Sequence, residues 1–109
     1  MIDVPGVDIA VHREGDNVVV DVRGEVDVTG ATELGGVVRD IVDEGASCLV
    51  LDLSAVTFLD STGLSVLVAG RNRCRANAGD LKLRDPSPAA WKVLTITGLD
   101  QVFAVDSTV

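Results

Sequence analysis

The sequence has 109 residues, of which 17 are acidic and 9 are basic, giving a formal net charge of -8. This length predicts one domain over residues 1–109 with a hydrophobic core of its own, and the acidic balance argues against nucleic acid as a partner, because that binding depends on neutralising phosphates with Lys and Arg. The sequence has no apolar run of about 18 residues and no basic start followed by an apolar stretch, so we expect a soluble cytoplasmic protein that does not bind membranes.

The first two predicted strands form an antiparallel hairpin. Residues 7–11 and 18–22 are rich in valine, and the polar turn residues 14–17 separate them. His12, the only histidine, lies near the end of the first strand and is expected to be solvated. Gly24 is expected to end the second strand.

An amphipathic helix follows the hairpin. Its apolar residues have the spacing i, i+3, i+4, i+7, i+8, and they are Leu34, Val37, Val38, Ile41 and Val42. Thr29 is the expected N-cap and Gly45 the expected C-terminal stop. Gly35 and Gly36 within this helix each cost about 1 kcal/mol relative to Ala.

The most informative stretch is the passage from a buried strand into a second helix. Residues 48–53 form a short apolar run, Phe58 and Leu59 extend it, and Asp60 and Ser61 stand where a helix begins. The apolar positions that follow have nearly helical spacing, and they are Leu64, Leu67, Val68, Cys74 and Ala78. Gly79 is expected to end this helix. Cys48 and Cys74 are the only cysteines, lack a metal-ligand spacing and are expected to be buried structural thiols.

The last third of the chain predicts one more strand–helix–strand unit. Leu81 and Leu83 belong to a short strand, Ser87 and Pro88 start a helix that runs to Gly98, and residues 102–105 form the last strand. The element order is therefore β, β, α, β, α, β, α, β. Its connections suit right-handed crossovers, so the chain is expected to be an α/β domain with a mostly parallel sheet.

Functional groups in such sheets gather beyond the carboxyl ends of the strands. Asp27 follows the second strand, and Asp60 with Ser61 follows the third, so these side chains are expected to share one rim. Ser61 at a helix start is explained either by plain capping or by a phosphate that the helix terminus tolerates. Position alone does not decide between the two.

Three motifs in order give a resemblance to a known family. Residues 58–64, Phe-Leu-Asp-Ser-Thr-Gly-Leu, resemble the phosphorylation segment of the anti-sigma factor antagonists, which are small bacterial STAS domains. Residues 24–27, Gly-Glu-Val-Asp, resemble a second signature of that family. Residues 93–99 and Phe103 resemble its C-terminal helix and last strand.

The resemblance implies a STAS-like domain, in which a hairpin strand lies at the edge of a mostly parallel five-stranded sheet and the helices lie mainly on one side. It implies that the unphosphorylated protein binds an anti-sigma factor that is also a serine kinase, which frees a sigma factor, and that phosphorylation of Ser61 ends this binding. Thr62 is the alternative acceptor, and a serine phosphatase reverses the reaction. The implied partner-binding residues are Glu25, Asp27, Asp60, Ser61, Thr62 and Gly63.

No enzyme activity, cofactor or metal site is expected in the chain itself. ATP and magnesium would belong to the kinase, because the sequence has neither GxxxxGK nor GxGxxG. The hypothesis that Ser61 is a catalytic nucleophile is disfavoured, because Ser61 lacks the preceding glycine of a GxSxG elbow and His12 is the only histidine that could act as its base. A two-component receiver would need an Asp acceptor where Ser61 stands. A STAS scaffold without a switch, or a ligand- or redox-sensing module, remains as an alternative.

Overall fold

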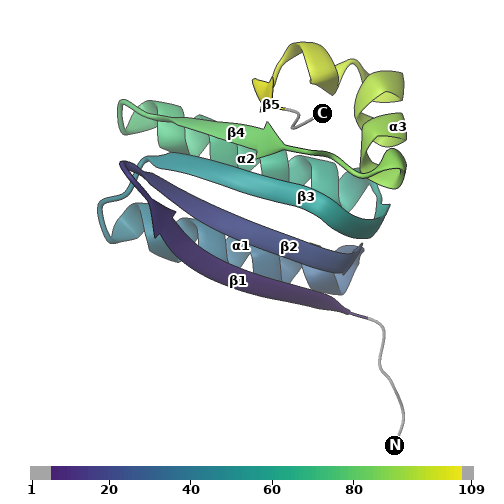
Figure 1. Ribbon diagram of the computed structural model, residues 1–109, viewed down its shortest axis with the longest axis horizontal. Coiled ribbons are helices and arrows are strands. Elements are labelled where there is room, and N and C mark those ends of the chain that lie inside the picture. Colours follow the sequence, from purple (N-terminus) through teal and green to yellow (C-terminus); the bar gives the residue numbers. More distant parts are fainter. Residues whose placement is uncertain (1–5, 107–109) are drawn as a thin grey trace, which may run out of the picture.

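The structure is a computed structural model that describes residues 6–106 (Figure 1). In chain order the elements are β1 (Val7–Glu14), β2 (Asn17–Val26), α1 (Val28–Asp43), β3 (Cys48–Leu59), α2 (Ser61–Ala76), β4 (Asp80–Arg84), α3 (Pro88–Thr97), a short 3-10 helix (Leu99–Gln101) and β5 (Val105–Asp106). This is the predicted order of strands and helices. Within the described residues, no helix combines the length and the apolar character needed to cross a bilayer.

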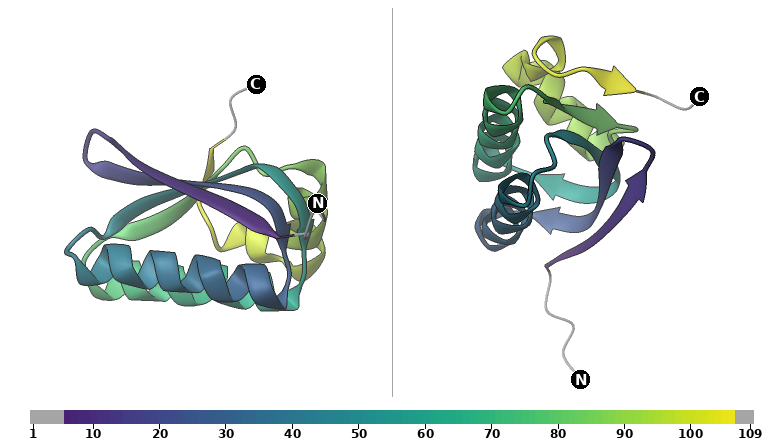
Figure 2. Two further views of the ribbon diagram at one scale, coloured as in Figure 1. Left: turned by 90° about the horizontal axis from the view of Figure 1, so that it is seen from below. Right: turned by 90° about the vertical axis from the view of Figure 1, so that its left-hand side faces the viewer.

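The strands form one five-stranded sheet in the order β1-β2-β3-β4-β5. β1 pairs antiparallel with β2, and the other three neighbouring pairs are parallel. α1 and α2 lie side by side along one face of the sheet, while α3 stands beside the end where α2 begins (Figures 1 and 2). The predicted mostly parallel sheet with helices mainly on one side is therefore confirmed.

The hydrophobic core fills the space between the sheet and these helices. Leu51 of β3, Leu34 of α1 and Leu67 of α2 are all fully buried there. Because successive side chains of a strand point to opposite faces, Cys48 lies on the face of β3 away from Leu49 and Leu51. The prediction of a buried thiol is thus right for Cys74, which is buried, and wrong for Cys48, which is exposed.

Gly24 bends the second strand and does not end it. The pairing of β2 with β3 shifts register at two places, one between Asp21 and Arg23 and one between Gly24 and Glu25. Gly24 has φ +98°, and a Cβ atom there would collide with the carbonyl oxygen of Gly6. A glycine therefore allows β2 to bulge and continue to Val26. As a result the N-cap of α1 is Asp27, and the prediction of Thr29 is wrong.

Two other predicted boundaries differ from those in the structure. α2 ends at Ala76, and Ala78 adopts a left-handed φ of +63° beyond it, so Ala78 is not part of the apolar face. The last strand was predicted over residues 102–105, but β5 is only Val105–Asp106. The 3-10 helix ends just before that stretch, but the N–H groups of Val102 and Phe103 still bond to the Leu99 carbonyl oxygen, and Phe103 is buried in the core. Ser87 caps α3 and Gly98 ends it, as predicted.

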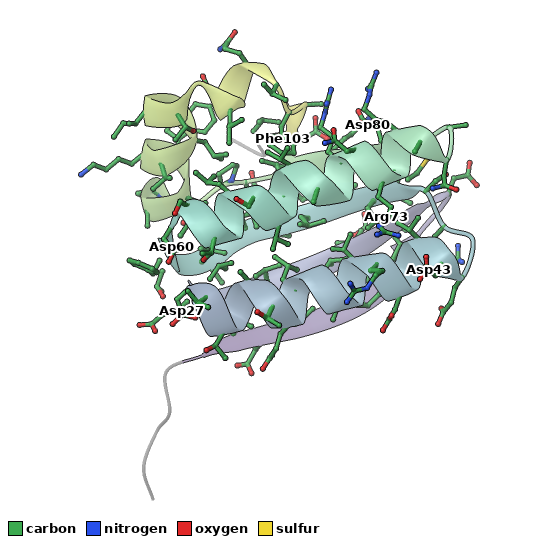
Figure 3. The ribbon with its side chains drawn as sticks, turned by 180° about the vertical axis from the view of Figure 1, so that it is seen from behind. Asp27, Asp43, Asp60, Arg73, Asp80 and Phe103 are labelled. Atoms are coloured by element: carbon green, nitrogen blue, oxygen red, sulfur yellow. The ribbon has the colours of Figure 1, made fainter. Side chains whose placement is uncertain are left out.

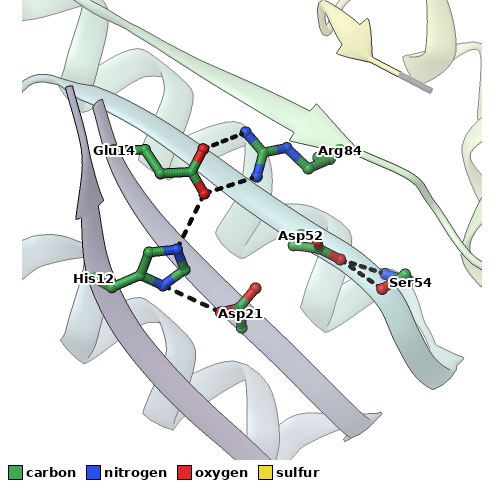
Figure 4. A network of polar contacts seen from close by, with 6 residues as sticks. All are labelled: His12, Glu14, Asp21, Asp52, Ser54 and Arg84. Carbon is green, nitrogen blue, oxygen red and sulfur yellow. Dashed lines mark hydrogen bonds and ion pairs between the residues drawn. The ribbon is translucent and has the colours of Figure 1, made fainter. Parts of the chain in front are cut away.

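A polar network lies on the sheet face opposite α1 and α2 (Figure 4). Both guanidinium branches of Arg84 donate to Glu14 at 3.2 Å, which links β4 to β1 across two strands. His12 is half exposed as predicted, yet its Nε2 lies 3.1 Å from Glu14 and its Nδ1 3.3 Å from Asp21. Hydrogen bonds from Arg84, and then from His12, lower the pKa of Glu14. The network links the end of the β1–β2 hairpin to β4. Because these side chains are exposed to solvent, the network contributes little to the stability of the fold.

The core assignment predicts opposite outcomes for two large apolar residues on helices. Leu34→Ala removes a fully buried side chain and should lower the free energy of unfolding by about 2–5 kcal/mol. Ile96→Ala removes a side chain that is 74% exposed and should change it by no more than about 0.5 kcal/mol. Urea denaturation followed by circular dichroism measures both. Similar losses in the two variants would contradict this core.

Candidate functional site

The parallel register of β2 and β3 brings two helix starts to one edge of the sheet. Val26 pairs with Leu59, and each is followed at once by an aspartate, Asp27 or Asp60, that caps the next helix. Asp27 accepts a hydrogen bond from the Gly30 N–H at 3.0 Å. Figure 3 shows Asp27 and Asp60 at the same end of the two helices. The predicted common rim is therefore present.

Asp60 makes the tighter of the two caps. Its Oδ1 accepts from the backbone N–H of Thr62 at 3.0 Å, from that of Gly63 at 3.1 Å, and from the Thr62 hydroxyl. These donors, the Thr62 hydroxyl first and the Gly63 N–H next, hold the pKa of Asp60 below its ordinary value. The carboxylate is therefore ionised at neutral pH, and it occupies N–H groups that an incoming anion would otherwise use.

Ser61 and Thr62 differ sharply although they are neighbours. Ser61 is exposed at the first turn of α2, and within residues 6–106 its hydroxyl has no hydrogen-bond partner; only its carbonyl oxygen accepts, from Ser65. Thr62 is half-buried, and its hydroxyl is already committed to Asp60. Of these two hydroxyls, that of Ser61 alone is both exposed and without a hydrogen-bond partner within residues 6–106.

Gly63 was expected in the partner-binding set, and the structure places it in the interior. A Cβ atom on Gly63 would lie 2.5 Å from Leu59 Cδ1, 2.9 Å from Val26 Cγ1 and 3.0 Å from the Val26 carbonyl oxygen. The first turn of α2 can approach the ends of β2 and β3 only because this residue has no side chain. Gly63 therefore acts on the site indirectly, by setting the position of Ser61.

Two exposed apolar residues join the acidic rim. Phe58, 47% exposed, pairs across the strands with the half-buried Glu25, and Val28, 64% exposed, opens α1 directly after Asp27. Sequence reasoning missed Val28 and gave Phe58 no contact role. The available signal was that Val28 precedes the apolar stripe of its helix and has no place in it. Large apolar side chains exposed beside a polar site are typical of protein interfaces.

The geometry does not support a serine nucleophile activated by histidine. His12 faces Val19 across the hairpin, Val19 pairs with Val50, and Ser61 comes after a further nine residues of β3. At about 3.3 Å per strand residue, the imidazole lies roughly 30 Å from Ser61. Within residues 6–106, no three His, Cys, Asp or Glu side chains are grouped so that they could bind a metal ion.

The packing at Gly63 can be tested against a second helical glycine. Alanine is more favourable than glycine inside a helix by about 1 kcal/mol. Gly36→Ala in α1 should therefore raise the free energy of unfolding by up to about 1 kcal/mol, because the added Cβ would contact only the Arg39 guanidinium, at 3.9 Å. Gly63→Ala should instead destabilise the protein by about 1–3 kcal/mol through overpacking. Urea midpoints that move in the same direction for both variants would refute the close approach.

The cap of Asp60 predicts a specific acid dependence of stability. Since its folded-state pKa is lowered, its stabilisation is complete above the unfolded-chain value of about 3.9 and disappears as the pH falls through the folded-state pKa. Asp60→Asn should therefore lose less stability than the parent protein in this acid range. Denaturation curves between neutral and acid pH test this, with Asp16→Asn in the hairpin turn as the charge control. Equal acid slopes for Asp60→Asn and the parent would contradict the cap.

Comparison with known proteins places this arrangement in a family. The STAS domain matches residues 8–109. The anti-sigma-B factor antagonist of Bacillus subtilis is 29% identical over 101 residues, which cover 93% of this chain and 92% of that protein. The anti-sigma-F factor antagonist RsfB of Mycobacterium tuberculosis is 30% identical over 90 residues, which cover 83% of this chain and 73% of that protein.

Solved structures agree in fold. The crystal structure of an anti-sigma factor antagonist from Mycobacterium paratuberculosis superposes with a TM-score of 0.84 at 32% identity, covering 94% of this chain and 87% of that one. Unphosphorylated SpoIIAA gives a TM-score of 0.80 at 21% identity, with 94% and 89% covered, and therefore supports the fold alone. Since the family match spans nearly the whole sequence, this chain belongs to the STAS domain family.

Proposed function

We propose that this protein is an anti-sigma factor antagonist controlled by phosphorylation of Ser61. In its unphosphorylated form it binds an anti-sigma factor that is also a serine kinase, and a sigma factor is thereby freed. Transfer of phosphate from ATP to Ser61 ends the binding, and a serine phosphatase restores it. The kinase supplies ATP and magnesium, and the exchange of partners takes place in the cytoplasm.

The names of several relatives support this proposal. The Bacillus subtilis and Mycobacterium tuberculosis proteins, and the Mycobacterium paratuberculosis structure, are all called anti-sigma factor antagonists. SpoIIAA, which shares the fold, has been solved in both its unphosphorylated and its phosphorylated form. A protein of this fold thus carries phosphate without losing its architecture.

The single observation that carries the proposal is the free hydroxyl of Ser61. It is exposed, lacks a hydrogen-bond partner within residues 6–106 and stands at the start of α2, where a kinase active site can reach it. Thr62 is a poorer acceptor, because phosphorylation there would break its hydrogen bond to Asp60 and open the helix cap. We therefore assign the modification to Ser61.

The switch works through local charge. A phosphoserine adds about -1.5 to -2 charge and three acceptor oxygens. Asp60 already occupies the N–H groups of Thr62 and Gly63, so these donors are not available to neutralise the phosphate. Because Ser61 points away from the core, the fold tolerates the new charge, while a partner packed against this acidic rim would have to desolvate it. A hundredfold loss of affinity corresponds to only about 2.7 kcal/mol.

The same surface offers the contacts that a partner needs. Phe58 and Val28 supply exposed apolar area, while Glu25, Asp27 and Asp60 supply acidic groups around it. A basic partner surface with an apolar centre complements this arrangement in charge and in shape. Phe58→Ala should therefore weaken binding without unfolding the protein.

Charge variants at position 61 test the switch. Ser61→Asp should weaken binding to the cognate anti-sigma factor at least about tenfold, because an aspartate carries part of the charge of a phosphate. Ser61→Ala should bind like the unmodified protein and should not respond to ATP. Isothermal titration calorimetry measures the affinities, and circular dichroism confirms that each variant is folded.

The charge control is Ser54→Asp, which adds the same charge to an exposed serine of β3 away from this rim. Because it also removes the hydrogen bond from the Ser54 hydroxyl to Asp52, circular dichroism first confirms that this variant is folded. It should bind normally. If Ser61→Asp and Ser61→Ala both bind as tightly as the unmodified protein, the chain is a STAS scaffold without a switch, and the proposal fails.

A further inference from the structure

A groove of about 320 Å³ lies between α1 and α2, outside the Ser61 site. The two helices lie side by side in front of the sheet in the view of Figure 3. Small or β-branched residues line most of the groove, among them Gly35 and Gly36 of α1 and Val66 and Ala69 of α2. Long apolar side chains do not fill this space, so another segment can lie along the two helices.

The charged residues that line this groove are cations. Arg39 of α1 and Arg73 of α2 line it, and among residues 6–106 no Asp or Glu does. Arg73 lies 3.6 Å from Asp43, and both side chains are well exposed, whereas the Arg39 side chain has no hydrogen-bond or ion-pair partner within the described part of the chain. On a chain of net charge -8, two cations beside one groove favour an acidic occupant.

The packing of the protein itself does not require the two glycines of α1 in this groove. A Cβ atom on Gly35 would make ordinary contact with Val66 at 3.6 Å, and one on Gly36 would meet only the Arg39 guanidinium at 3.9 Å. Alanine would therefore fit at either position, and it would make the helix more stable than glycine does. What the glycines provide is a helix surface without side chains, which the backbone of another segment can approach closely.

We propose that this groove binds an amphipathic helix of a partner protein, in which a strip of small apolar residues is flanked on both sides by Asp or Glu. The apolar strip packs on Val66, Ala69 and the glycines, and the carboxylates pair with Arg39 on one side and Arg73 on the other. A helix suits the groove better than an extended segment, because the helices that border it pair their backbone groups internally and offer no strand edge. The inference does not depend on the function proposed for Ser61, which does not line the groove.

The glycine amides of α1 make the test direct. The full chain is isotope-labelled for NMR, and the probes are two capped helical peptides in which an alanine and leucine strip lies between either glutamates or lysines. The glutamate peptide should shift the amide signals of Gly35 and Gly36 in a saturable way, with a dissociation constant below about 1 mM and about tenfold tighter than the lysine peptide.

Three variants separate the charge of the groove from its shape. Arg39→Gln should weaken binding of the glutamate peptide severalfold. Arg13→Gln should not, because Arg13 is an equally unpaired, exposed cation of β1 that lies outside the groove. Gly36→Leu should fill the groove and weaken binding at least about tenfold. Circular dichroism should show that Gly36→Leu remains folded, because the new side chain points into open space beside Arg39.

Three outcomes would overturn the proposal. The first is no shift of the Gly35 and Gly36 signals with the glutamate peptide at millimolar concentration, and the second is equal affinity for the two peptides or unchanged affinity in a folded Gly36→Leu variant. The third is a shift that grows with protein concentration alone, which would make a second copy the occupant. Since no anti-sigma factor takes part in the experiment, its failure would leave the function proposed for Ser61 intact.

Discussion

The parallel pairing of β2 with β3 is the constraint on which the rest of the molecule depends. Its register ends on Val26 and Leu59, so the two strands deliver their following residues, Asp27 and Asp60, to the same edge. Each aspartate then starts a helix, and the two helices run back side by side under the sheet. A slip of one residue in this register would turn the apolar faces outward and separate the two caps.

This arrangement separates the part of the molecule that forms the core from the part that we propose binds a partner. Leu34, Leu51 and Leu67 fill the interior, and Gly63 lets α2 pack closely against it. Ser61, two residues before Gly63, is nevertheless exposed. The acidic caps serve both parts, because they satisfy helix N–H groups and also set the potential at the rim. In the proposed function, a change of charge at Ser61 alters docking while the core remains as it was.

Periodicity and capping rules predicted most of the fold from the sequence. The apolar stripe of α1, the Ser87–Pro88 start of α3 and the strand-to-helix passage at Asp60 depend on local signals, and all three are confirmed. The errors have tertiary causes. The sequence suggests that Gly24 ends a strand, whereas in the structure Gly24 allows a β-bulge close to the backbone of Gly6. Because β2 continues through that bulge to Val26, Asp27 and not Thr29 caps α1. Residues 102–105 have the composition of a strand, but the backbone of Val102 and Phe103 bonds back to Leu99 at the end of the 3-10 helix, and Phe103 is buried in the core.

The site was predicted in part by position and in part by resemblance. The shared rim was predicted from the rule that functional groups gather at the carboxyl ends of parallel strands. The preference for Ser61 over Thr62 came from the family motif. The structure is consistent with this preference, because the Thr62 hydroxyl already donates a hydrogen bond to Asp60. Neither source indicated Val28, because exposure on a folded surface is not a property of local sequence.

The most direct test of the account is an amide NMR spectrum of the protein before and after its kinase has phosphorylated it. The account predicts a phosphoserine at position 61, with signal changes confined to the starts of α1 and α2 and the adjoining ends of β2 and β3, and none in the rest of the core strands. Changes that spread through β3 and β4, or a phosphate on any other residue, would contradict it.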